Sequence, residues 1–95
     1  MKNLYLIIYD LRNSEMNYNG LFEAIKGLSG NWKHPMVSTW FVSSEIELST
    51  QDIYDKLKPF IDDGDNILVI DMNNPKNRQG WMQKTFWQWL NVEQQ

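Results

Sequence analysis

Two runs of consecutive apolar residues stand out along this chain, and each run ends at an acidic residue. Residues 4–9 are aliphatic or aromatic and are followed by Asp10, and residues 67–70 are aliphatic and are followed by Asp71. Near-continuous apolar runs of this length are typical of strands buried on both faces. The pattern predicts strands over residues 3–10 and 66–72.

Apolar residues at helical spacing predict two helices that pack on one sheet. The first helix has one apolar stripe, formed by Leu21, Phe22, Ile25 and Leu28, and Gly30 is a suitable stop. The second helix begins at residue 49 and has an apolar face that contains Ile53, Leu57 and Ile61.

The second helix has recognisable signals at both ends. Ser49 precedes Asp52 by three residues, which resembles a capping box with Asp in place of Glu. Pro59 lacks a backbone N–H group and is expected to kink or end the helix. The turn over residues 62–65 then leads into the strand over residues 66–72.

Between the two helices, the sequence predicts a β-hairpin. Pro35 interrupts the segment 31–37 and cannot donate to a ladder, so this strand is expected at a sheet edge. Residues 39–42 are rich in β-branched and aromatic side chains and are its expected partner.

After the last predicted strand, a polar loop over residues 73–80 leads to a helix over about residues 81–91. The side of this helix expected to pack against the sheet edge contains Met82, Phe86, Trp89 and Leu90. Trp87 points elsewhere in this prediction, where it could meet a partner subunit.

The predicted order is βαββαβ followed by a helix, in one α+β domain over residues 1–95. This order predicts a ferredoxin-like antiparallel sheet with two helices on one face and an extra C-terminal helix. The first and third strands would be central. The fourth, over residues 66–72, would lie at an edge and be covered by a partner or by the C-terminal helix.

Composition adds expectations about partners and compartment. Aromatic residues make up 14% of the 95 residues, more than so small a core readily holds, so we expect some of them at a homodimer interface. The net charge of −3 disfavours broad binding of nucleic acid. The absence of cysteine fits a cytoplasmic protein and excludes thiolate metal sites. No apolar stretch is long enough to span a membrane.

Several segments together carry a family resemblance, and they cover nearly the whole chain: 6–11, 17–18 with 21–26, Trp32 with 38–40, 65–70 and Trp89-Leu90. They resemble small bacterial and phage proteins labelled "SinR family", which lack the helix-turn-helix of the sporulation repressor of that name and whose function is unassigned. More remotely, Tyr9-Asp10 and residues 38–42 resemble the Cas-two family of CRISPR adaptation proteins, and virulence-associated protein D shares this layout.

The Cas-two resemblance implies a dimer in which the acid after the first strand, here Asp10, binds a metal and takes part in phosphodiester cleavage. Two Asp10 carboxylates across a twofold axis could share Mg²⁺ or Mn²⁺, and Arg12 is a weaker catalytic candidate that could hold a phosphate. The competing interpretations are that Asp10 accepts backbone N–H bonds in a turn and that Arg12 is solvated. The C-terminal segment departs from the family, because it predicts an aromatic helix where Cas-two proteins usually add a strand to the partner's sheet.

Two further sets of residues have weaker claims to function. Lys76, Arg78 and Trp81 could follow a nucleic-acid backbone and stack a base, although a solvated loop is the simpler interpretation. His34, the only histidine, lacks a second imidazole for zinc and is expected to have a structural role in the hairpin.

These observations leave two hypotheses and do not decide whether the protein is an enzyme. The first is a Cas-two-like dimer, a metal-dependent nuclease or nucleic-acid-handling subunit with Asp10 as metal ligand. The alternative is a non-enzymatic dimerising interaction module in which Asp10 is structural.

Overall fold

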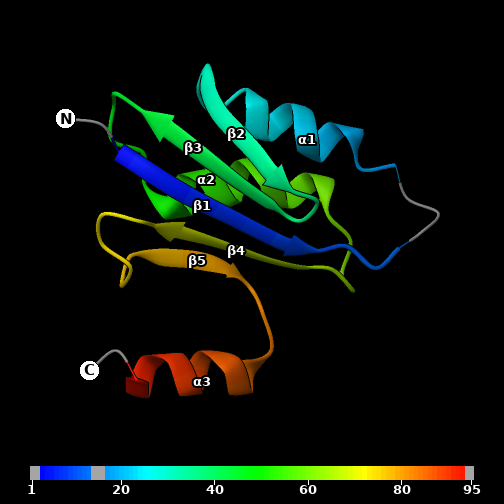
Figure 1. Ribbon diagram of the computed structural model, residues 1–95. Coiled ribbons are helices and arrows are strands. Elements are labelled where there is room, and N and C mark those ends of the chain that lie inside the picture. Colours follow the sequence, from blue (N-terminus) through cyan, green and yellow to red (C-terminus); the bar gives the residue numbers. More distant parts are fainter. Residues whose placement is uncertain (1–2, 14–16, 94–95) are drawn as a thin grey trace.

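The computed structural model describes residues 3–13 and 17–93, and within them it shows one α+β domain with a five-stranded antiparallel sheet and three α-helices (Figure 1). The elements are β1 (Asn3–Asp10), α1 (Asn19–Lys26), β2 (Asn31–Met36), β3 (Thr39–Ser44), α2 (Thr50–Leu57), a short 3₁₀ turn (Lys58–Phe60), β4 (Asn66–Asp71), β5 (Arg78–Trp81) and α3 (Lys84–Glu93). The strand order across the sheet is β2-β3-β1-β4-β5. None of the helices in the described residues is long and apolar enough to cross a membrane.

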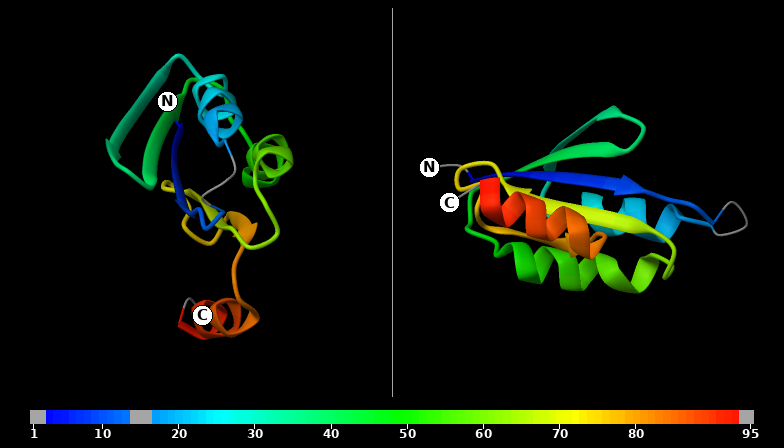
Figure 2. Two further views of the ribbon diagram at one scale, coloured as in Figure 1. Left: turned by 90° about the vertical axis from the view of Figure 1, so that its right-hand side faces the viewer. Right: turned by 90° about the horizontal axis from the view of Figure 1, so that it is seen from below.

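Strand β1 is central, as its apolar run predicts, and its side chains alternate between two unlike faces. Tyr5, Ile7 and Tyr9 are at most 5% exposed and form the core with α1 and α2. The side chains between them lie on the opposite face of the sheet, because successive residues of a strand point to opposite sides. Helices α1 and α2 cover only the first of these faces (Figure 2).

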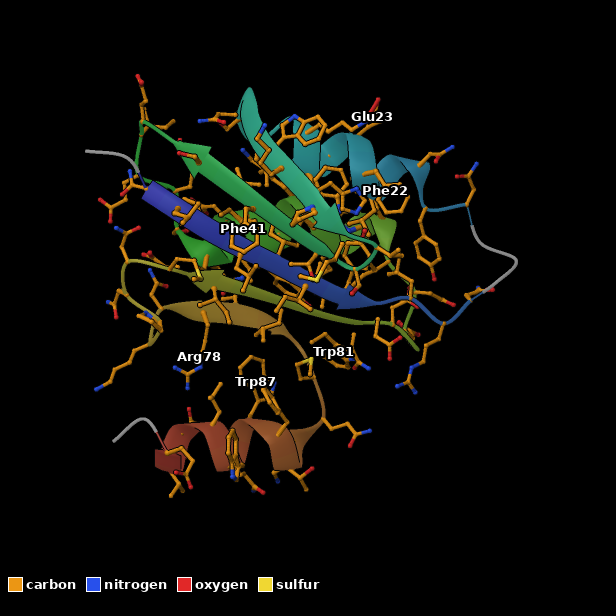
Figure 3. All side chains as sticks on the ribbon, in the orientation of Figure 1. Phe22, Glu23, Phe41, Arg78, Trp81 and Trp87 are labelled. Carbon is orange, nitrogen blue, oxygen red and sulfur yellow. The ribbon has the colours of Figure 1, made fainter. Side chains whose placement is uncertain are left out.

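The second face is apolar, and in the described chain no helix covers its centre (Figure 2). Pairing places Leu6 of β1 between Phe41 of β3 and Ile70 of β4, and places Ile8 beside Leu68. Figure 3 shows Phe41 on this side of the sheet. We call this surface the open face; its members are Leu4, which is exposed, Leu6, Ile8, Phe41 and Ile70, which are half-buried, and Leu68, which is 8% exposed.

The start and end of α2 are confirmed. The Ser49 side chain accepts a hydrogen bond from the backbone N–H of Asp52 at 2.9 Å, which is an N-cap, and α2 ends at Leu57 before the 3₁₀ turn that contains Pro59. Helix α1 ends earlier than expected, at Lys26, and Gly27 is its C-terminal cap residue.

The predicted edge strand is also confirmed. Strand β2 pairs only with β3, and the register shifts between Lys33 and Met36, on either side of Pro35. The missing N–H of proline interrupts the ladder where the strand has no second neighbour, which is where such an interruption is tolerated.

The prediction of a four-stranded sheet with β4 at its edge is wrong. Residues 78–81 form β5, which pairs antiparallel with β4, although residues 73–80 are predicted to be a loop. The segment Arg78-Gln79-Gly80 has little intrinsic preference for a strand. It becomes one because the apolar strand β4 presents unpaired backbone groups beside it.

The C-terminal helix begins later than predicted and turns a different side to the sheet. Trp81 lies on β5, and Met82 lies between β5 and α3. Phe86, Trp87 and Leu90 are half-buried, and Figure 3 shows Trp87 directed from α3 towards β5. Trp89 is 58% exposed, so the prediction that Trp89 packs on the sheet while Trp87 points elsewhere is wrong.

Candidate functional site

Asp10 lies at the end of β1, on the open-face side, and its carboxylate is paired with Arg12. The Asp10 Oδ2 atom accepts from Arg12 Nε at 2.8 Å and lies 2.7 Å from Nη2. Both side chains are more than half exposed, so the pair contributes little to stability. Its chemical effect is that the carboxylate oxygen which would bind a cation already faces a guanidinium.

The loop after Asp10 is held by a buried carboxylate, that of Asp65. Asp65 is fully buried and accepts from the Arg12 backbone N–H at 2.7 Å, the Asp62 backbone N–H at 2.8 Å and the Tyr18 hydroxyl at 2.7 Å. These donors come from the segment after β1, the turn before β4 and the start of α1. One side chain therefore joins three segments and positions the Asp10–Arg12 pair.

The hydrogen bonds of Asp65 determine its charge. Burial alone would raise the pKa of this carboxyl, but the N–H groups of Arg12 and Asp62 and the Tyr18 hydroxyl outweigh burial and hold the pKa below its ordinary value. Burial, together with donation to Asp65, raises the pKa of Tyr18. Asp65 is thus a buried anion, and Tyr18 remains a neutral donor beside it.

A cleft of about 330 Å³ opens beside the Asp10–Arg12 pair, where the start of α3 approaches the open face. Its apolar lining includes Ile8 and Leu68 from the sheet, with Met82 and Phe86 from the C-terminal segment. Its polar lining is Asp10, Arg12, Asn66 and Gln83. The cleft is near the lower size limit of small-molecule sites.

Within one chain, the residues around Asp10 do not fit a resident divalent cation. Asp10 pairs across the sheet with Asn66, whereas Asp71 lies opposite Tyr5 near the other end of β1. The described residues contain no group of three or more His, Asp or Glu side chains placed to hold a metal ion. Mg²⁺ and Mn²⁺ prefer several oxygen ligands, and here one carboxylate is available with a cationic side chain against it.

Asp71 has a structural role at its own end of the sheet. Its Oδ1 atom accepts from the backbone N–H of Asn73 at 2.9 Å, and its backbone N–H donates to the carbonyl oxygen of Asn77 at 2.9 Å. This is an Asx-type turn that leads from β4 towards β5.

The predicted nucleic-acid residues do not form one surface. Arg78 pairs with Ile70 and shares the open-face side of β5, where it donates to Asn91 Oδ1 of α3 at 2.6 Å. Trp81, three residues on, lines a hollow with Tyr54 and Lys58 of the α2 side. Lys76 is exposed in the loop before β5. Figure 3 shows Arg78 and Trp81 well apart along the strand.

His34 belongs to an aromatic cluster on the hairpin. Its ring stacks on Trp40 with centroids 3.8 Å apart and planes at 13°, and its Nε2 atom lies 3.1 Å from the Val37 carbonyl oxygen. Trp40 in turn donates from Nε1 to the Tyr9 hydroxyl at 2.9 Å. These contacts agree with the predicted structural role for His34.

Comparisons with protein-family models, with curated proteins and with solved structures find no match to this chain. Sequence reasoning treated Asp65 only as part of a turn and did not anticipate the cleft. A weak signal for Asp65 existed, namely an acid directly before an apolar strand, but two of its three donors, Arg12 and Tyr18, are about 50 residues away.

Proposed function

We propose that this protein is a cytoplasmic, non-enzymatic interaction module that functions as a homodimer through its open face. The observation that carries the proposal is a half-buried apolar sheet face whose centre no helix of the described residues covers, beside a helix that exposes Trp89 and Val92. Leu4 is 36% exposed on this face, and Met72, which follows β4, is 41% exposed. Contiguous apolar surface on a small domain is typical of a contact site.

We further propose that β1 to β4 belong to the ferredoxin-like arrangement. The antiparallel order β4-β1-β3-β2 supports this assignment, as do α1 following β1 and α2 following β3 on the same side of the sheet. Strand β5 and helix α3 are then additions at the β4 edge. Ferredoxin-like domains serve many functions, so this assignment does not choose among activities.

The dimer is tested by sedimentation velocity at micromolar protein concentration. We expect the wild-type chain to sediment with twice its monomer mass and Leu4→Lys to shift towards monomer, because a buried unpaired lysine is costly in an apolar contact. Val37→Lys is the matched control, since Val37 is 89% exposed in the β2–β3 turn and is not a member of the open face. A wild-type protein that stays monomeric would contradict the proposal.

A second candidate function is metal-dependent phosphodiester cleavage, as the Cas-two resemblance implies. One observation favours it: the Asp10 side chain lines a cleft and is more than half exposed, so it is accessible to a ligand. A second copy would have to supply another Asp10, because one chain offers too few oxygen ligands.

Cleavage is tested with labelled single-stranded RNA and duplex DNA in the presence of Mg²⁺, Mn²⁺ or EDTA. For an interaction module, we expect no metal-dependent cleavage by the wild type. The free energy of unfolding of Asp10→Ala should lie within about 0.5 kcal/mol of the wild-type value, because the lost ion pair is exposed. Cleavage that needs metal, disappears in folded Asp10→Ala and survives in Asp63→Ala would establish the nuclease instead.

A further inference from the structure

Helix α3 has two apolar sides, and its own chain covers only one of them. Phe86, Trp87 and Leu90 are half-buried towards β5 and the cleft. On the other side, Trp89 is 58% exposed and Val92 is 63% exposed. None of the described side chains of α3 is fully buried. A helix that is apolar on both sides is typical of one that packs between two partners.

The position of α3 leaves its second side available. The helix lies beyond β5, separate from α1 and α2, along the lower edge of the sheet in Figure 1. A hydrogen bond from Arg78 Nη2 to Asn91 Oδ1, at 2.6 Å, joins α3 to β5. The charged residues of α3, Lys84 and Glu93, stand at its two ends, so the side between them is uncharged.

We infer that Trp89 and Val92 of α3 pack on the open face of a second copy of this chain, and that the second copy returns the same contact. This inference rests on the proposed homodimer and specifies its interface. One chain carries both an uncovered helix side and an uncovered sheet face. A twofold arrangement covers all four surfaces at once, as an interface between identical subunits requires.

The area available agrees with a weak dimer and not with an obligate one. Large aromatic side chains bury roughly 150–250 Å² each when fully covered, and about half of Trp89 and Val92 is exposed here. Two helix sides and two matching sheet patches would bury on the order of 600–1,000 Å², at or below the lower limit for a specific interface and in the range of transient contacts. The dimer should therefore dissociate in the micromolar range.

Charge also permits a second copy at this position. The one acid on the open-face side of β1 is Asp10, and it is already neutralised by Arg12. Although each chain has a net charge of −3, no unpaired carboxylate of β1 would therefore face another carboxylate at the centre of the contact. An apolar helix side meeting an apolar sheet face needs no charged partner.

The test uses one variant on each half of the interface. Val92→Lys alters the helix side, Met72→Lys alters the rim of the open face, and Val37→Lys is again the control. Each of the first two should weaken the dimer by about tenfold or more in sedimentation equilibrium, because it introduces an unpaired charge into both contacts. The control should leave the dimer unchanged.

The decisive measurement is a 1:1 mixture of Val92→Lys and Met72→Lys. In a mixed dimer, one contact joins the intact helix of one copy to the intact face of the other. The mixture should therefore associate several-fold more tightly than either variant alone, although both substitutions add the same positive charge. No recovery, with both variants impaired, would overturn the reciprocal contact and indicate helix–helix or face–face pairing.

The remaining outcomes separate this inference from the proposed function. If the wild type is a dimer and Val92→Lys dimerises equally well, the inference fails and the homodimer stands. If the wild type is monomeric at every concentration tested, both fail. Closure of α3 on its own open face would give that second result.

Discussion

Replacing Asp65 by alanine should destabilise the protein by about 3 kcal/mol. The substitution leaves the backbone N–H groups of Arg12 and Asp62 without their acceptor in a buried site. Each buried donor left without a partner costs about 1–3 kcal/mol, and hydrogen bonds to a charged group are the stronger kind. Chemical denaturation of the wild type and Asp65→Ala measures this difference directly.

The effect should depend on pH in a defined direction. The pKa of Asp65 is lowered in the fold, so its stabilising contribution is fully present above its unfolded pKa, near pH 4, and is lost as pH falls through the lower folded value. The difference in unfolding free energy between wild type and Asp65→Asn should therefore shrink below about pH 4.

Asp63→Ala is the matched control for Asp65, because Asp63 is an exposed carboxylate in the same turn. We expect it to change stability by less than about 0.5 kcal/mol. If Asp65→Ala proved as mild as Asp63→Ala, the buried carboxylate would not be the junction of the three segments.

Replacing Gly80 by alanine should separate β5 from β4. A Cβ atom at Gly80 would overlap the Ile67 carbonyl oxygen and lie 2.8 Å from the Leu68 Cα atom. Both are backbone atoms of a buried strand and cannot move aside as a flexible side chain would. We expect a loss of about 3 kcal/mol or more, corresponding to a decrease in Tm of roughly 10–20 °C.

Hydrogen exchange locates the damage from Gly80→Ala. Protection should fall in residues 78–81 and 84–93 while β1 and β3 keep theirs, because the clash lies at the edge of the sheet. Gly64→Ala is the control, since its Cβ would meet no atom of the described residues within 4 Å. Equal stability of the two alanine variants would show that β5 does not approach β4 as closely as this.

The central features of the fold could be predicted from the sequence because their causes are local. Six consecutive apolar or aromatic residues predict a buried, central β1, and the strand is central. The expected burial of both its faces is wrong, because Tyr5 and Ile7 are fully buried on one face while Leu4 on the other is 36% exposed. The cap at Ser49 involves residues three apart. Pro35 prevents regular pairing by its own ring, so β2 belongs at an edge.

The candidate site was predicted only in part. Asp10 was identified because an acid after an apolar strand is visible in sequence, but its pairing with Arg12 depends on how the loop turns. That turn is determined by Asp65, whose donors Arg12 and Tyr18 are 53 and 47 residues distant along the chain. No local pattern encodes contacts over such a separation.

The sequence by itself determined where the buried strands and helices lie, since period, caps and proline act within a few residues. Tertiary structure alone decided that residues 78–81 become a strand, because only the unpaired edge of β4 gives their weak β preference a partner. It also decided which side of α3 faces the domain. That side depends on where β5 ends and how the chain turns at Met82, and the apolar pattern of α3 is broad enough to allow either Trp87 or Trp89 to face inward.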